Sequence, residues 1–506
     1  MTFVDNLSLG FQTALTPEAL LFCFAGVTLG TLVGVLPGIG ALATISMCLP
    51  LTFYLDPTVA LIMLAGIFYG AQYGSSTAAI LLNIPGTATA AATCLDGHPM
   101  ARNGRAGVAL FMTSIASFVG GSFAIALLIL FAPMLANVAV RFTSAEYFAI
   151  MLLGLVAAST LSVGSPIKGL AMVFVGIAVG LAGMDVNTGT LRFAFGSYRF
   201  ADGFSLVAVA MGIFGISEII KNLAHNDAPR IERKAITFRS LVPTRADWRA
   251  SWGPMGRSSV LGSAVGILPG AGPSIAAFMA YAMERKLSRH PEKFGTGTVE
   301  GVVAPEAANN ASVQAAFIPT LSLGIPGDAV MAVLIGALMI HGIAPGPLLV
   351  VEHPEMFWGL VASFWVGNVL LLVLNIPFIG LWVRVLTIPY RVLYPAMLFF
   401  ICVGVYSVNN SVFDVYVAMG FGVIGYLLML YNFPIAPLLL GYILGPLMEQ
   451  HLRRTLLISR GDILVFLERP VSAALIGLTL AILVWMAVSQ ARKHSAKRAM
   501  LTRPNG

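Results

Sequence analysis

Two Pro-Gly breaks inside apolar segments are the places where this chain is best equipped to bind a ligand. Residues 34–40 read Gly-Val-Leu-Pro-Gly-Ile-Gly, and residues 266–272 read Gly-Ile-Leu-Pro-Gly-Ala-Gly. Proline disrupts the helical ladder, glycine accepts unusual backbone conformations, and the following half-helix begins with free N–H groups that attract anions. We therefore predict an anion-binding site at both breaks. Its residues would be Pro37, Gly38, Gly40, Pro269, Gly270 and Gly272.

A second Pro-Gly motif is also duplicated. Residues 82–88 read Leu-Asn-Ile-Pro-Gly-Thr-Ala, and residues 323–329 read Leu-Gly-Ile-Pro-Gly-Asp-Ala. The first motif recurs after 232 residues and the second after 241, so the two halves resemble copies of one unit. One Pro-Gly alone is usually a helix kink, because both residues are common in membrane helices. Matched breaks in both halves instead indicate a transporter's substrate site. This motif would add Asn83, Gly86, Thr87 and Gly327 to it.

Small uncharged polar side chains follow each of the first two breaks. They can donate and accept hydrogen bonds without bringing a net charge into a membrane, and their oxygens also suit Na⁺. In the first half these predicted site residues are Ser75, Ser76 and Thr77. In the second half they are Asn309, Asn310 and Ser312, followed by Gln314.

Two acidic residues close to these motifs are candidates for coupling transport to a cation. An acid at the centre of a bilayer costs about 2.5–3.5 kcal/mol on insertion scales, so it is retained for a reason. Asp328 directly follows a Pro-Gly, and Glu306 precedes the paired asparagines. Each could be a cation ligand or a proton carrier, although Asp328 could equally be a helix-start acid stabilised by the dipole. Asp96 and His98 are interpreted as loop-end residues, and His341 as part of a structural turn.

The composition places these motifs in an all-α polytopic membrane protein. Of 506 residues, 58% are hydrophobic and 10% are charged, with a mean hydropathy of +0.88. Apolar runs of about 20 residues recur along the chain, which predicts about 10–12 membrane segments. The four cysteines have no metal-binding or redox spacing, and no nucleotide-binding or catalytic motif is found. We therefore predict a non-enzymatic protein that needs no cofactor other than a coupling ion, Na⁺ or H⁺.

The distribution of basic residues predicts the topology. In the first half, the loop 54–57 after the LPG segment has no basic residue, whereas the loop after the Ile-Pro-Gly motif carries Arg102 and Arg105. In the second half this is reversed, because the loop over 284–293 is rich in Lys and Arg and the loop over 352–355 has neither. Because basic loops stay in the cytoplasm, equivalent loops fall on opposite sides of the membrane. This is the signature of an inverted-topology repeat, and each LPG segment would then be a re-entrant hairpin. The N-terminus is predicted outside the cytoplasm and the C-terminus inside.

Four regions follow from this pattern. We predict a first membrane repeat over 1–220, a basic cytoplasmic linker over 221–257 and a second membrane repeat over 258–450. Residues 451–506 would form a C-terminal helix and a basic cytoplasmic tail. One cluster disagrees with the scheme, because Arg453, Arg454 and Arg460 would lie on the external side, where an interfacial segment is the only interpretation available.

Taken together, these motifs resemble the large membrane subunit, TctA, of the tripartite tricarboxylate transporters. The resemblance covers essentially the whole chain. Its first-half signature includes Tyr-Gly-Ala-Gln-Tyr-Gly-Ser-Ser-Thr, and its second includes Ala-Pro-Glu-Ala-Ala-Asn-Asn. The segments concerned are 34–40, 69–77, 83–86, 96–99, 266–272, 304–310 and 324–327.

The resemblance implies a secondary importer of di- or tricarboxylates such as citrate, driven by Na⁺ or H⁺, in a bacterial inner membrane. It also implies a periplasmic solute-binding protein that delivers the substrate, and a small four-helix membrane subunit. A homo-oligomer is a further possibility. Two other functions stay open from the residues alone: a membrane-embedded enzyme acting on a lipid-linked substrate, and a passive anion channel. The identity of the carboxylate stays open as well.

Overall fold

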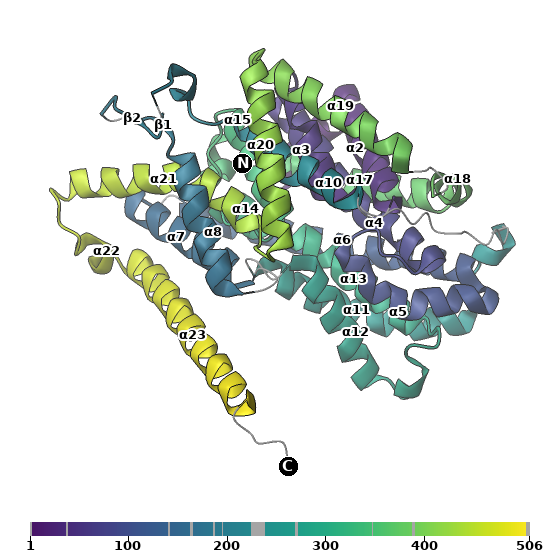
Figure 1. The fold of residues 1–506 in the computed structure, drawn as a ribbon. Coiled ribbons are helices and arrows are strands. Elements are labelled where there is room, and N and C mark those ends of the chain that lie inside the picture. Colours follow the sequence, from purple (N-terminus) through teal and green to yellow (C-terminus); the bar gives the residue numbers. More distant parts are fainter. Residues whose placement is uncertain are drawn as a thin grey trace.

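The fold is almost entirely helical (Figure 1). The computed structural model describes residues 3–36, 39–139, 142–161, 165–185, 188–194, 196–223, 238–268, 272–346, 348–386 and 390–501. The helices of the first half are α1 (Phe3–Ala14), α2 (Pro17–Val35), α3 (Gly40–Thr52), α4 (Pro57–Leu82), α5 (Ala91–Met100), α6 (Ala106–Ala139), α7 (Ser144–Leu161), α8 (Pro166–Gly180), α9 (Leu206–Ala210) and α10 (Ser217–Leu223). Those of the second half are α11 (Arg245–Ile267), α12 (Gly272–Leu287), α13 (Glu300–Ala315), α14 (Phe317–Leu323), α15 (Ala329–Ile340), α16 (Leu349–Glu352), α17 (Pro354–Asn375), α18 (Ile379–Val385), α19 (Tyr390–Asn409), α20 (Val412–Leu430), α21 (Ala436–Ile458), α22 (Val465–Glu468) and α23 (Pro470–Leu501).

Short elements complete the described part. They are the helical turns η1 (Ala88–Ala90), η2 (Ala101–Arg105), η3 (Tyr198–Phe200), η4 (Met211–Ile216), η5 (Phe238–Leu241) and η6 (Pro291–Lys293), and an antiparallel pair of two-residue strands, β1 (Gly183–Met184) and β2 (Leu191–Arg192).

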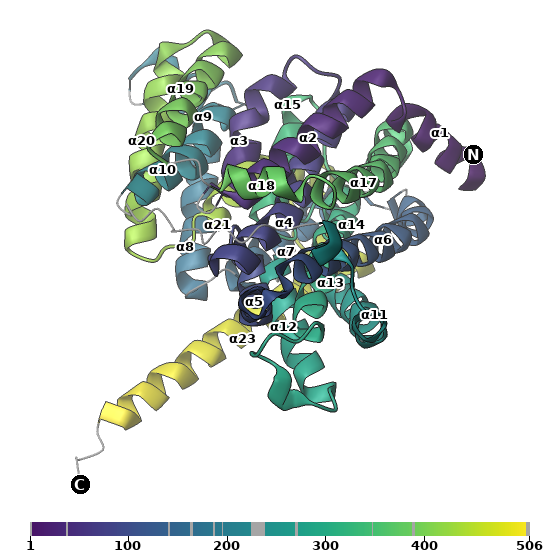
Figure 2. The ribbon, with the colours of Figure 1, turned by 90° about the vertical axis from the view of Figure 1, so that its right-hand side faces the viewer.

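Six of the described helical segments are long and apolar enough to cross a membrane. Several shorter apolar helices accompany them, including α3 and α15. The prediction of an all-α polytopic membrane protein is therefore confirmed, while the full number of membrane segments stays a prediction. Among the six, α4 is the most enclosed, because 94% of its most apolar window is buried. Figures 1 and 2 show this helix surrounded by elements of both halves.

Glycines allow α2 and α4 to pack with their backbones almost in contact. A Cβ added at Gly34 would lie 2.8 Å from the Cα of Ala71, and one at Gly30 would lie 2.8 Å from the Cα of Ile67. Such close approach is how small residues drive association of helices in lipid, where no hydrophobic force between helices operates. The contact spans several turns, since Gly66, Gly70 and Gly74 of α4 face α2 in the same way.

The second half repeats this contact with α11 and α13. A Cβ at Gly266 would lie 2.7 Å from the Cα of Ser312, and one at Gly262 would lie 2.6 Å from the Cα of Ala308. Gly266 is 232 residues after Gly34, and Ser312 is 241 residues after Ala71. The spacings of the duplicated motifs are therefore also the spacings of the packed residues.

The Ile-Pro-Gly turns after α4 and α14 match each other too. Asn83 and Gly324, 241 residues apart, end these helices with φ values of 57° and 69°. This left-handed conformation suits Asn and Gly and stops the helix. Gly86 then lies against Gly34, and Gly327 lies against Gly266. In both halves the second Pro-Gly motif consequently packs on the helix that leads into the first.

A third duplicated motif relates α6 to α17. Residues 116–121 read Ala-Ser-Phe-Val-Gly-Gly, and residues 362–367 read Ala-Ser-Phe-Trp-Val-Gly, 246 residues later. The first copy contacts α13, since a Cβ at Gly120 would lie 2.9 Å from the Cα of Ala307. The second contacts α4, because the Tyr69 ring lies 2.8 Å from the Cβ position of Gly367. Each copy therefore packs on the central helix of the opposite half.

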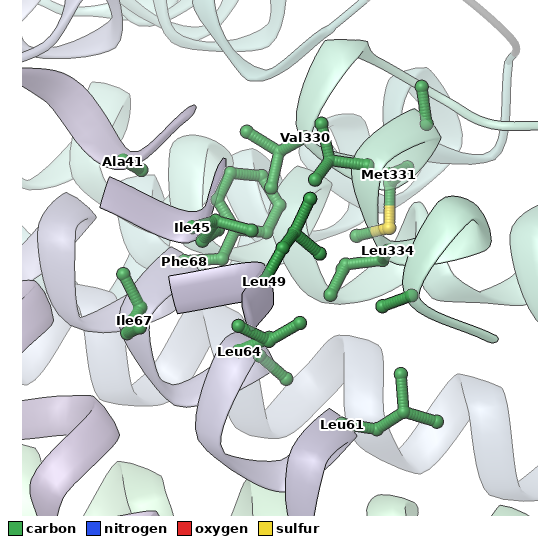
Figure 3. Close-up of a cluster of buried hydrophobic side chains, with 14 of the residues drawn as sticks. Ala41, Ile45, Leu49, Leu61, Leu64, Ile67, Phe68, Val330, Met331 and Leu334 are labelled. Atoms are coloured by element: carbon green, nitrogen blue, oxygen red, sulfur yellow. The ribbon is translucent and has the colours of Figure 1, made fainter. Parts of the chain in front are cut away.

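Apolar side chains connect the first half to the helix that follows the second Ile-Pro-Gly. Figure 3 shows Ile45 and Leu49 of α3, Phe68 of α4 and Leu334 of α15 in one buried cluster. All four are at most 3% exposed. Their packing fixes α3 and α15 against α4.

One residue of the basic cluster that disagreed with the predicted topology, Arg453, is paired with acids. Arg453 of α21 lies 2.7 Å from Glu449 and 3.3 Å from Asp185, which follows β1. Arg192 of β2 forms ion pairs with the same two acids. Two cations and two anions thus make a closed group that need not be drawn to the cytoplasmic side. Arg454 and Arg460 are exposed, and α23 extends away from the body (Figure 1).

The end of the predicted linker is helical and tied to the first half. Thr244 and Asp247 form a capping box that starts α11, and Arg105 of η2 donates to both carboxylate oxygens of Asp247 at 2.7 Å. Burial raises the pKa of Asp247, but the bonds from Arg105 and Thr244 outweigh it, so the pKa lies below its usual value. Residues 245–257 of the predicted linker are thus the first part of helix α11.

Candidate functional site

The described residues on either side of each LPG segment have matching conformations. Leu36 and Leu268 leave α2 and α11 with extended backbones, at φ −87° and −78°. Gly40 and Gly272 then begin α3 and α12 with φ values of +70° and +64°. The left-handed value needs glycine in both places. The predicted tip residues Pro37, Gly38, Pro269 and Gly270 lie outside the described residues.

Glu306 of α13 is the centre of a buried polar cluster. The Thr93 hydroxyl of α5 donates to its Oε1 at 2.5 Å, and the Ser117 hydroxyl of α6 donates to its Oε2 at 3.3 Å. Asn310, one turn along α13, donates from Nδ2 to the Ser117 oxygen at 2.8 Å. The Ser76 hydroxyl of α4 also faces the carboxylate but does not reach hydrogen-bond geometry. Four helices thus converge on one acid.

No basic side chain balances this acid within the described part of the chain. Glu306 is 1% exposed, and its described hydrogen-bond partners are uncharged hydroxyls. A carboxylate removed from water without a counter-charge is strongly destabilised, so it takes up a proton or pairs with a cation. The oxygens of the Glu306 carboxylate and of the surrounding hydroxyls are the hard ligands that small cations prefer. The geometry therefore suits either a proton or a small monovalent cation.

Gln72 of α4 connects the two halves close to the predicted polar runs. Its Oε1 accepts from the Thr89 hydroxyl of η1 at 2.7 Å and from Asn309 of α13 at 3.4 Å. Thr89 in turn shares a 2.7 Å hydrogen bond with Thr87. This series of hydrogen bonds fixes the Ile-Pro-Gly turn of the first half against α13, the central helix of the second half. The Oδ1 of Asn309 has no described partner.

Tyr73 of α4 and Asn368 of α17 form a second hydrogen-bonded link between the two halves. The Tyr73 hydroxyl donates to Asn368 Oδ1 at 3.1 Å, and both side chains are buried. The Asn368 Nδ2 group is buried without a partner among the described residues. It lies 2.8 Å from the Cβ position of Gly121, so the amide group occupies the space that a side chain on α6 would need.

Three of the predicted polar residues make no described hydrogen bond to a side chain of the Glu306 or Gln72 clusters. Ser75 donates to the carbonyl oxygen of Gln72 at 2.8 Å. Thr77 is buried at the same end of α4, with 4% of its surface exposed. The Ser312 backbone packs on Gly266, and its hydroxyl is buried without a described partner.

Asp328 has a structural role that the sequence left open as an alternative. It is the N-cap of α15, and its Oδ1 accepts from the backbone N–H of Met331 at 2.9 Å. This satisfies one of the free amides at the start of the helix. No described hydrogen bond connects Asp328 with the Glu306 cluster, so the structure does not join the two predicted coupling acids in one cluster.

Asp96 is a buried anchor for the loop between α12 and α13. Its carboxylate accepts from three backbone amides, those of Gly295, Gly297 and Thr298, at 2.8–3.0 Å, and from the Tyr281 hydroxyl at 2.9 Å. These donors hold a buried charge without a cation. Nearby, a His98 ring nitrogen lies 3.2 Å from the Ile80 carbonyl oxygen. Asp96 and His98 both lie within helix α5, which continues into η2, so the interpretation of them as loop-end residues is wrong. His341 caps the end of α15, as expected of a turn residue.

The model of the Tripartite tricarboxylate transporter TctA family matches residues 20–440. The chain belongs to the TctA family. It is 50% identical over 484 residues, 96% of each chain, to "Uncharacterized 52.8 kDa protein in TAR-I ttuC' 3'region" of Agrobacterium vitis. It is 52% identical over 223 residues to "Uncharacterized protein in TAR-II ttuC' 3'region" of the same organism, covering 44% of this chain and 92% of the relative. No solved structure matches.

Membership of the TctA family makes this protein a component of a tripartite transporter, with the membrane location that its apolar helices indicate. The motifs that carried the resemblance are thus identified correctly. Sequence reasoning missed several residues of the Glu306 and Gln72 clusters: Gln72, Thr89, Thr93, Ser117 and Asn368. For Ser117 the signal was present, because it lies in the Ala-Ser-Phe motif that recurs in α17.

Proposed function

We propose that this TctA-family protein imports di- or tricarboxylates such as citrate, coupled to the entry of Na⁺ or H⁺. The observation that carries the coupling is the buried Glu306 carboxylate, whose described partners are all uncharged. The free energy of burying the Glu306 carboxylate is lowest when a proton or a cation is bound to it. The fraction of Glu306 that carries the proton or cation therefore responds to the ion gradient. The carboxylate specificity rests on family membership and on the amide and hydroxyl donors around Gln72 and Asn309.

The same proposal places the protein in a bacterial inner membrane, with its N-terminus in the periplasm and its C-terminus in the cytoplasm. A periplasmic solute-binding protein would deliver the substrate, and a small four-helix membrane subunit would complete the assembly. These partners follow from the tripartite family rather than from any contact described here.

The two LPG segments would gate the substrate from opposite sides of the membrane. The repeated glycine contacts of Gly34 and Gly266 support two equivalent units, and inverted repeats place equivalent gates on opposite faces. In this mechanism the block of α2–α5 and α11–α15 moves against the remaining helices. Replacing Gly38 or Gly270 by Val should abolish uptake while the protein still inserts, because a branched side chain crowds the tip. Normal uptake by both variants would show that the tips of the LPG segments are not part of the substrate site.

Uptake measurements test the coupling. Membrane vesicles containing the full-length protein, the cognate binding protein and the small subunit are given labelled citrate, succinate or malate. We expect accumulation above the external concentration with an inward Na⁺ or H⁺ gradient, and none without either gradient. Equilibration without accumulation would indicate a passive channel, and accumulation without any cation gradient would refute the coupling.

A substitution at Glu306 tests whether this acid couples transport to the cation. Glu306→Gln keeps the size of the side chain and removes its charge, so cation-driven accumulation should be lost. Glu292→Gln is the matched control, because that carboxylate is 66% exposed and lies in the loop before α13. Equal gradient dependence in both variants would show that Glu306 is a structural acid.

A further inference from the structure

A surface cavity lies at the C-terminal end of α12, apart from the Glu306 and Gln72 clusters. It has a volume of about 430 Å³ and is lined by Tyr281, Ala282, Arg285, Lys286 and Pro291. This volume is in the range that small ligands occupy in proteins. All of the lining residues except Tyr281 are exposed, and α12 lies at the edge of the body (Figures 1 and 2), so a ligand can reach the cavity from outside.

The two basic side chains that line this cavity have no acidic partner within the described part of the chain. The last turn of α12 does contain an acid, Glu284, but its carboxylate is paired with Arg257 of α11 at 2.6 Å. The Glu284 side chain is only 2% exposed, because it lies on the buried face of the helix. Arg285 and Lys286 therefore keep their full positive charge on the outer face, where an anion can pair with them.

The other acids close to the cavity are turned away from it or already bonded. Asp96 is buried, and its carboxylate accepts from the Tyr281 hydroxyl at 2.9 Å and from backbone amides of the loop after α12. Glu292 lies 3.2 Å from a ring nitrogen of His290 and does not line the cavity. The rings of Tyr281 and Phe294 pack edge to face, with centroids 5.5 Å apart, which holds this loop against α12. The cavity thus has a fixed wall, two cations and no acid.

An exposed apolar stripe on α12 leads into the cavity. Ile275, Phe278 and Met279 are 41–46% exposed, and Ala282 continues the same face one turn later. At about 100° per residue, these four positions lie within an arc of about 100°, and Lys286 follows on the same arc. The stripe is about 10 Å long, most of the depth of one leaflet of a bilayer. A molecule with an apolar tail and an anionic head matches this arrangement.

We propose that the cavity binds the headgroup of an anionic phospholipid, whose acyl chains lie along Ile275, Phe278 and Met279. Arg285 and Lys286 supply charged N–H donors for the phosphate oxygens. The predicted topology places this end of α12 at the cytoplasmic surface, where basic pockets beside membrane helices hold anionic headgroups. The helix dipole also favours cations at this end, but it explains neither the cavity nor the apolar stripe.

Titration of the purified full-length protein in detergent with phosphatidylglycerol tests this site, and phosphatidylcholine, which has no net charge, is the comparison lipid. A lipid that binds only the folded protein raises the thermal unfolding midpoint. Phosphatidylglycerol should therefore raise the midpoint more than phosphatidylcholine does at the same concentration. The double variant Arg285→Gln, Lys286→Gln should need at least about tenfold more phosphatidylglycerol for half of this shift, because each cation near the headgroup adds to the binding.

Two further variants separate this cavity from general surface charge. Arg245→Gln combined with Arg249→Gln is the matched control, because these arginines of α11 are also exposed but do not line the cavity. This control should keep the titration of the wild type. Ala282→Glu places a carboxylate four residues before Lys286, where the two side chains can pair. It should weaken the response to phosphatidylglycerol at least about tenfold, and, because Ala282 is exposed, leave the midpoint in phosphatidylcholine unchanged.

Each other outcome overturns the proposal in a recognisable way. Equal shifts by the two lipids, or an equal loss in the Arg245 and Arg249 double variant, would refute a specific headgroup site. A shift of the same size with inorganic phosphate or citrate would show that the cavity takes a soluble anion instead. If the double variant of the cavity does not fold, Ala282→Glu and Lys286→Gln decide by the same criterion. None of these measurements involves uptake, so this site and the proposed import fail or stand separately.

Discussion

The close contact between α2 and α4 yields a stability prediction whose size follows from the coordinates. In Gly34→Ala, the new methyl carbon would lie 2.8 Å from both the Cα and the carbonyl carbon of Ala71. Carbon atoms normally approach to about 3.5–4.0 Å, so the helices must part by about 1 Å. Both sides of the contact are backbone, which cannot rotate away as a side chain can.

The cost is estimated from two opposing effects. Overpacking of this kind costs about 1–3 kcal/mol, and the rigid contact places it near the upper end. The better helix propensity of alanine returns at most about 1 kcal/mol. The expected net destabilisation is about 2 kcal/mol. Gly420→Ala on α20 is the matched control, because no atom lies within 4 Å of its Cβ position. That variant should be neutral or slightly stabilised.

Unfolding of the purified full-length protein in detergent measures the difference. Gly34→Ala should unfold at a clearly lower temperature than both the wild type and Gly420→Ala. Gly266→Ala should behave like Gly34→Ala, since its Cβ would lie 2.7 Å from the Cα of Ser312. If Gly34→Ala and Gly420→Ala unfold at the same midpoint, the helices do not pack as closely as described, and the argument for equivalent units is lost.

Three further predictions concern acidic residues. Asp328→Asn should retain cation-driven uptake, because asparagine also caps helices, whereas Asp328→Ala should lose about 1 kcal/mol of stability; loss of coupling in Asp328→Asn would make the residue a cation ligand instead. Asp96→Asn removes one acceptor oxygen from the loop anchor, so trypsin should cleave at the exposed Arg289 and Lys293 several times faster than in the wild type, and unchanged cleavage would show that the anchor does not hold the loop. Arg105→Gln should lower the unfolding midpoint at neutral pH and progressively less below about pH 3.8, because Asp247 has a lowered pKa in the folded protein and its ionised form stabilises the fold only above that range. A difference between Arg105→Gln and wild type that stays constant down to pH 3 would contradict this ion pair.

The sequence determined the class of this protein and the places where its helices break. Composition and apolar run length settle the membrane environment, because a bilayer demands long apolar helices regardless of how they pack. Pro-Gly and Asn or Gly at αL positions interrupt helices by local sterics, so Asn83 and Gly324 could be found from the chain alone. The duplication is likewise visible as motifs that recur at a fixed spacing in the sequence. These motifs are the ones by which the family could be identified.

Tertiary structure alone decided which polar side chains meet. Glu306 receives hydrogen bonds from Thr93 and Ser117, 213 and 189 residues away, and nothing local in the sequence relates those positions. The neighbours that each helix faces also distinguish the two acids, because Asp328 caps its own helix whereas Glu306 accepts hydrogen bonds from side chains of other helices. The pairing of Arg453 with Asp185 and Glu449 was hidden for the same reason. Hydrogen bonds and ion pairs between helices depend on rotation and register, which are set by backbone contacts such as that of Gly34 rather than by residue types.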